Sequence, residues 1–129
     1  MYLKNFCKFT VIGGAIIIEF IKWVVRPYFH LVQPVKFIMG IMPNLFGAFL
    51  LPLGCYWLLN RYINLFSDLQ LKLFCFICFL LLVFNEVLQL IPFFGRTFDW
   101  NDILASAAGL LLSYAFCSRF LFKRYATYP

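Results

Sequence analysis

Charged residues are scarce in this sequence. Only 12% of its 129 residues are Asp, Glu, Lys or Arg, whereas ordinary soluble domains contain about 25%. Hydrophobic residues make up 64% of the chain, and the mean hydropathy is +0.90. A water-soluble domain of this length cannot bury so much apolar surface. The composition therefore predicts an integral membrane protein with a single membrane domain, residues 1–129.

Histidine is almost absent, and this scarcity argues against a metal centre. His30 is the single histidine, and Cys75 and Cys78 form a C-x-x-C pair that no second pair completes. Tetrahedral metal sites need more ligands than this. The serines have no nearby base to activate them as nucleophiles. The sequence thus predicts no metal, no cofactor and no catalytic residue, which leaves enzymatic activity open but favours a non-enzymatic protein.

The formal net charge of +6 does not indicate a nucleic-acid partner. The basic residues stand at the ends of apolar runs, where they orient membrane helices. If four segments cross the membrane, seven of the Lys and Arg residues lie on one side and four on the other. The positive-inside rule then predicts a multi-pass protein of the plasma (inner) membrane with both termini in the cytoplasm.

The apolar runs predict an all-α membrane bundle of about four transmembrane helices, at about 9–25, 37–60, 71–91 and 103–122. Glu19 and Lys22 interrupt the first segment, so two interpretations stay open: a full span or a half-inserted interfacial helix. Pro43 and Pro52 should kink the second segment or leave irregular backbone there. Small residues from Ala105 to Gly109 predict close packing of the fourth segment on a neighbour.

One group of polar residues surrounds the turn between the third and fourth segments. Glu86 and Gln89 share a helix face, and Arg96 follows the turn made by Pro92 and Gly95. Ionisable groups in hydrocarbon face a protein interior or a water-filled cavity. We expect a Glu86–Arg96 ion pair. The candidate site, which either binds a ligand or only joins two helices, comprises Glu86, Gln89, Arg96, Asp99 and Asp102.

A second polar stripe lies near the end of the first segment. Glu19, Lys22, Arg26 and His30 are spaced by three or four residues, so a continuous helix places them on one face. In the predicted topology this stripe belongs to the same outward end as the candidate site. Lys22 and Arg26 would assist the site in binding an anionic group, such as a lipid phosphate.

The pattern Glu86-x-x-Gln89, Pro92, Gly95-Arg96, Asp99-x-x-Asp102-Ile103-x-Ala105 and Gly109 resembles the C-terminal half of the VanZ-like family. The resemblance covers about residues 83–114. It departs from the family where Ser106 or Ala107 replaces the usual Asn. The family consists of small multi-spanning bacterial membrane proteins, one of which is associated with low-level resistance to teicoplanin. The resemblance implies a role in the cell envelope, at the outer face of the plasma membrane.

These observations lead to one main functional hypothesis. The protein would bind or mask an anionic lipid-linked or glycopeptide-related envelope component at the outward polar site. Its partners would be membrane lipids, that ligand, and either a second copy or another membrane protein. The alternatives are an enzyme that uses Glu86 as acid or base on a lipid-linked substrate, a small transporter, and an accessory subunit of a membrane complex.

Overall fold

The computed structural model describes residues 2–28, 32–59, 62, 68–91 and 98–121. These residues contain helices and no strand. The long helices are α1 (Tyr2–Phe20), α3 (Gln33–Leu59), α4 (Asp68–Leu88) and α5 (Trp100–Phe116). The all-helical fold with four long helices is therefore confirmed. Shorter elements extend two of them: η1 (Ile21–Val25), α2 (Arg26–Tyr28) and η3 (Cys117–Leu121).

The helix ends differ from the predicted bounds for identifiable reasons. α1 begins at Tyr2 rather than near residue 9, because the polar residues before Phe9 are compatible with a helix although they are not apolar. α4 ends at Leu88 rather than at Ile91. The N–H of Ile91 donates to the Leu88 carbonyl at 3.1 Å, which closes a tighter turn. Proline disfavours helical backbone at the residue before it, and Pro92 follows directly.

The second predicted segment is one uninterrupted helix of 27 residues, although it contains Pro43 and Pro52. Each proline removes one backbone hydrogen bond from the helix. Pro52 is fully buried, so its ring contributes to packing where the donor is lost. α3 stays helical through both prolines, so irregular backbone, one of the two expected outcomes, is not found there.

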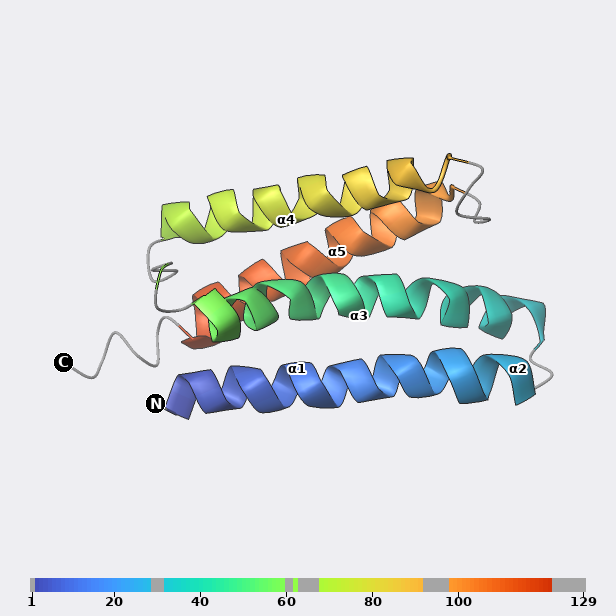
Figure 1. Ribbon diagram of the computed structural model, residues 1–129, viewed down its shortest axis with the longest axis horizontal. Helices are drawn as coiled ribbons and strands as arrows, with labels where there is room; N and C mark the ends of the chain where they lie inside the picture. Colours follow the sequence, from blue (N-terminus) through green and yellow to red (C-terminus); the bar gives the residue numbers. More distant parts are fainter. Residues whose placement is uncertain (1, 29–31, 60–61, 63–67, 92–97, 122–129) are drawn as a thin grey trace.

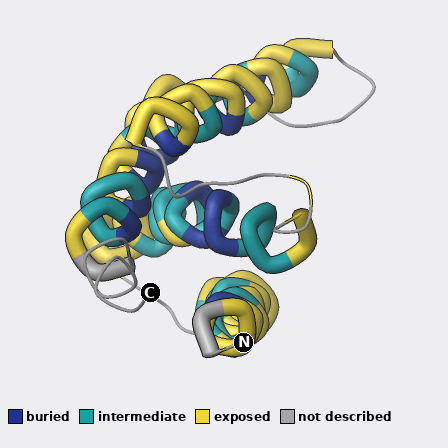
Figure 2. The backbone as a smooth tube through the Cα atoms, turned by 90° about the vertical axis from the view of Figure 1, so that its left-hand side faces the viewer, coloured by how far each residue is buried: buried dark blue, intermediate teal, exposed yellow. Residues whose placement is uncertain are grey.

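The long helices run antiparallel in sequence order and lie side by side in the order α1, α3, α5, α4 (Figure 1). α3 contacts α5 most extensively, and α1 packs on α3 at one edge. α4 packs mainly on α5 at the other edge. Seen end-on, the row curves into an open C (Figure 2). α1 and α4 are therefore the edge helices, and α3 and α5 form the centre.

The α3–α5 seam is closely packed because small residues repeat along α5. Buried small residues recur every four positions, at Ala105, Gly109 and Ser113 of α5 and at Cys117, the first residue of η3. A Cβ added to Gly109 would overlap the carbonyl oxygen of Leu45 and lie 2.9 Å from the Cβ of Ala48. Small residues at this spacing let two helix backbones approach each other. The predicted close packing of this segment is confirmed.

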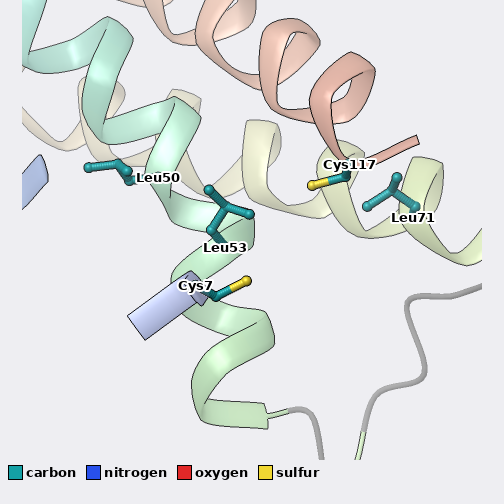
Figure 3. Close-up of a cluster of buried hydrophobic side chains, with 5 residues drawn as sticks. All are labelled: Cys7, Leu50, Leu53, Leu71 and Cys117. Atoms are coloured by element: carbon teal, nitrogen blue, oxygen red, sulfur yellow. The ribbon is translucent and has the colours of Figure 1, made fainter. Parts of the chain in front are cut away.

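The buried core is small and draws on all four long helices or their extensions. One cluster, drawn in Figure 3, contains Cys7, Leu50, Leu53, Leu71 and Cys117. A second cluster contains Ala48, Cys78 and Leu110, from α3, α4 and α5. On the α1 side, a Cβ at Gly14 would overlap the side chain of Leu50. α1 and α3 therefore also meet at a glycine.

Candidate functional site

Glu86 lies on the inner face of α4. The buried residues of this helix are Leu71, Cys78 and Glu86, whose spacing of seven and eight residues keeps them on one side. Glu86 is only 6% exposed. The N–H of Gln89 donates to the Glu86 carbonyl at 3.1 Å, so half-buried Gln89 lies one turn beyond it. The structure thus places a carboxylate within the packed end of an apolar helix.

Asp99 begins α5 and acts as its N-cap. One of its carboxylate oxygens, Oδ1, accepts hydrogen bonds from the backbone N–H and the side-chain amide of Asn101, both at 2.9 Å. This arrangement satisfies a backbone donor that the first helical turn leaves free. Half-buried Asp102 follows in the first turn, where a negative charge is favourable. Asp99 therefore caps the N-terminus of α5, and Asp102 lies within its first turn.

Arg96 and His30 lie outside the described residues. The Glu86–Arg96 ion pair therefore stays a prediction. The described members of the candidate site are Glu86, Gln89, Asp99 and Asp102, and they all belong to the end of the row where α4 finishes and α5 starts (Figure 1). Three of the four described members, Glu86, Asp99 and Asp102, are carboxylates.

The residues of the polar stripe near the end of α1 form hydrogen bonds with different parts of the chain. The carboxylate of Glu19 accepts a hydrogen bond from the indole N–H of Trp23 at 2.7 Å. The Arg26 guanidinium donates to the Gly40 carbonyl of α3 at 3.1 Å. Lys22 is exposed and lies in the π-helical segment η1. Arg26 thus attaches this stripe to α3.

The stripe and Glu86 lie at the same end of the row but at its two edges. Glu19, Lys22 and Arg26 belong to the α1 edge, and Glu86 belongs to the α4 edge. α3 and α5 lie between them (Figure 1). Among the described cations at this end, Lys22 and Arg26 are separated from Glu86 by α3 and α5. Lys36 lies exposed near the start of α3.

A second polar cluster occupies the opposite end of α4. The carboxylate of Asp68 accepts a hydrogen bond from the Tyr114 hydroxyl at 2.6 Å and pairs with the Lys72 ammonium at 2.7 Å. The Lys72 nitrogen also lies 5.8 Å from the centroid of the Tyr114 ring. The spacing of Asp68 and Lys72 by four residues could have indicated their pair. Tyr114 could not be found this way, because it comes from α5.

In the described ranges, no group of three or more His, Cys, Asp or Glu side chains is arranged to hold a metal ion. All five cysteines are free thiols. Cys75 and Cys78 lie three residues apart on α4, and each packs among apolar side chains of the core clusters. These thiols act as small core residues.

Comparison with known proteins gives no match: neither a protein-family model, nor a curated protein, nor a solved structure matches this chain. The likeness to the VanZ-like family over residues 83–114 therefore stays a hypothesis.

Proposed function

We propose that this chain is a multi-spanning membrane protein of the cell envelope. Following the VanZ-like resemblance, it would bind or mask an anionic lipid-linked or glycopeptide-related component at the end that contains Glu86. The observation that carries the membrane assignment is the exposed face of α4, which points away from the other helices. Exposed apolar residues recur along it at helical spacing: Leu73, Phe76, Ile77, Leu80, Leu81, Phe84 and Val87.

This pattern is the reverse of that on a surface helix of a soluble protein, which exposes its polar face. A contiguous apolar stripe of this length is unstable in water and is favourable in a bilayer. α3 and α4 have 27 and 21 residues, with mean hydropathies of 1.7 and 2.3 over their most apolar stretches. At 1.5 Å per residue, each is long enough for a hydrocarbon core of about 30 Å.

The two shorter helices lie alongside these two. α5 has 17 residues and continues for 5 more as η3. α1 has 19 residues, continues through η1, and packs lengthwise on α3 (Figure 1). An interfacial helix would instead lie across the helix ends, in the plane of the membrane surface. The lengthwise packing therefore supports a first segment that crosses with the others.

The charges at the two ends support an orientation. The end where α1 begins has the exposed cations Lys4, Lys8, Lys72 and Arg119. In sequence, Arg61 follows α3, and Lys123 and Arg124 follow η3. The opposite end has Lys22, Arg26 and Lys36, and Arg96 follows α4 in sequence. The richer end should be cytoplasmic, so the end with Glu86 faces outward.

The outward end combines a buried carboxylate with exposed cations. An ionisable residue within a membrane helix is by default a functional candidate. Glu86 meets this description, since it is buried near the end of α4. Lys22 and Lys36 supply positive charge at the same end, where an anionic headgroup would arrive from the outer leaflet. This arrangement supports an anionic envelope ligand.

Two experiments test this proposal. Extraction of cell membranes with alkaline carbonate should leave the protein in the pellet, and recovery in the supernatant would refute the membrane assignment. Binding of purified protein to teicoplanin and to vesicles containing an undecaprenyl-phosphate lipid should then be compared for two double variants. Lys22→Ala with Lys36→Ala should weaken binding, whereas Lys4→Ala with Lys8→Ala should not. Equal binding by both variants would refute the outward site.

A further inference from the structure

An open groove lies between α4 and α5, on the opposite side of α5 from its tight seam with α3. Its volume is about 380 Å³, and nearly all of its lining is apolar. Phe76 and Phe79 of α4 form one wall, and Ala107 and Leu111 of α5 form the other. Lys72 and Tyr114 also line it. The groove therefore has apolar walls and two residues with polar groups.

Those two residues lie together at one end of the groove. The Lys72 nitrogen lies 5.8 Å from the centroid of the Tyr114 ring. Because α4 and α5 are antiparallel, Phe79 and Ala107 each lie seven residues from this point in the same direction along the groove. This separation corresponds to about 10 Å of axial rise. Lys72 is in the first turns of α4, at the end assigned to the cytoplasmic side. The groove thus runs from a polar end toward the middle of the helices.

The polar end carries both signs of charge. Asp68 pairs with Lys72 at 2.7 Å and accepts from the Tyr114 hydroxyl at 2.6 Å. The side chains of Lys72 and Asp68 are 57% and 56% exposed, so both can bind a further partner. An ammonium has three donors and a carboxylate has about four acceptor positions, of which these contacts use only some. The formal charge of the pair is zero.

A ligand that fits has an apolar chain and a headgroup with both signs of charge. A headgroup with only negative charge would be attracted by Lys72 and repelled by Asp68 at nearly the same place. A zwitterionic headgroup with a phosphate and a free amine matches both. We propose that this groove binds one phosphatidylethanolamine molecule of the inner leaflet, with its phosphate on Lys72, its ammonium on Asp68 and an acyl chain between α4 and α5.

This inference rests on the proposed membrane location, but on a different end of the protein from the outward site. The first test is the lipid retained after detergent purification, measured by native mass spectrometry. Wild type should keep one phosphatidylethanolamine. Ala107→Phe, which fills the groove, should lower this occupancy at least about tenfold, equivalent to about 1.4 kcal/mol. Ala108→Phe is the matched control, because Ala108 is exposed beside the groove, and should keep the lipid.

The second test separates headgroup recognition from groove filling. In nanodiscs with equal amounts of phosphatidylethanolamine and phosphatidylglycerol, wild type should prefer the former. Asp68→Asn removes the negative charge and should shift the preference toward phosphatidylglycerol. Lys8→Ala, outside the groove, should change nothing. Equal retention by Ala107→Phe and Ala108→Phe, or an unchanged headgroup ratio in Asp68→Asn, would overturn the proposal. Release by alkaline carbonate would instead overturn the membrane location itself.

Discussion

The two sides of α5 differ sharply in how they meet their neighbours. Toward α3, Ala105, Gly109 and Ser113 are buried, and the backbones approach so closely that no Cβ fits at Gly109. Toward α4, Phe76, Phe79 and Leu111 leave a groove of about 380 Å³. Small side chains close an interface, because backbones then pack directly, whereas large ones hold the helices apart. The side of α5 that faces α3 thus stabilises the fold, whereas the side that faces α4 leaves the groove in which we propose a lipid.

The loose side makes α4 depend on few buried residues, of which Glu86 is the polar one. Glu86→Ala should therefore produce the largest effect among these predictions. Removing one member of the predicted Glu86–Arg96 ion pair would cost about 3–5 kcal/mol. The melting temperature in detergent, measured by scanning fluorimetry, should fall strongly. Asn85→Ala, at the exposed neighbouring position, is the control. Equal melting of the two variants would show that α4 is not held by Glu86.

A single added methyl group on the side of α5 that faces α3 should destabilise the protein. Gly109→Ala places a Cβ against the Leu45 carbonyl and Ala48, and overpacking of this kind costs about 1–3 kcal/mol. Gly47→Ala is the matched change in α3, where a Cβ meets nothing within 4 Å. That variant should gain up to about 1 kcal/mol from helix propensity. The sign of the melting shift should therefore differ between the two glycines, and a shared sign would contradict the seam.

The open side should tolerate a much larger addition. Ala107→Phe extends into the groove rather than into packed atoms, so its stability should change by only about 0.5 kcal/mol. The measurement is the melting temperature of protein stripped of lipid by repeated detergent exchange. Gly109→Phe provides the comparison on the tight side and should prevent recovery of folded protein on size-exclusion chromatography. Similar behaviour of the two variants would remove the distinction between the sides.

The smallest expected change in stability comes from a disulfide that would join α4 to α3. The thiols of Cys55 in α3 and Cys78 in α4 lie close enough to interact. A variant that keeps only these two cysteines should form an intramolecular disulfide with diamide, and its melting temperature should change little. A variant that keeps only Cys7 and Cys78, on the two edge helices, should not. Mass spectrometry of alkylated protein distinguishes the products, and crosslinking of both pairs would contradict the order of helices.

Several features were predictable because they depend on local sequence. The four helices follow from apolar runs of sufficient length, and the Asp99 cap follows from a carboxylate at a helix start. The burial of Glu86 on the inner face of an apolar helix was also expected, since a charge avoids hydrocarbon. Helix ends were less accurate, because hydropathy detects apolar residues and overlooks the polar first turns of α1.

Contacts between distant residues were not predictable in this way. Asp68 and Tyr114 are 46 residues apart and meet only because α4 and α5 are antiparallel neighbours. Likewise, the sequence placed Glu19, Lys22 and Arg26 at the same end as Glu86, but it could not place them at opposite edges of the row. Side-by-side order depends on which faces fit together, and no single segment contains that information.

The sequence by itself determined that the chain forms long apolar helices, with polar groups near their ends, because helix formation and hydrophobicity are properties of local segments. Only the tertiary structure decided that α5 closes against α3 and stays open toward α4. That choice depends on the small residues of two helices meeting in register, with Gly109 opposite Leu45 and Ala48. Steric fit between surfaces, rather than composition, decided where a groove remains.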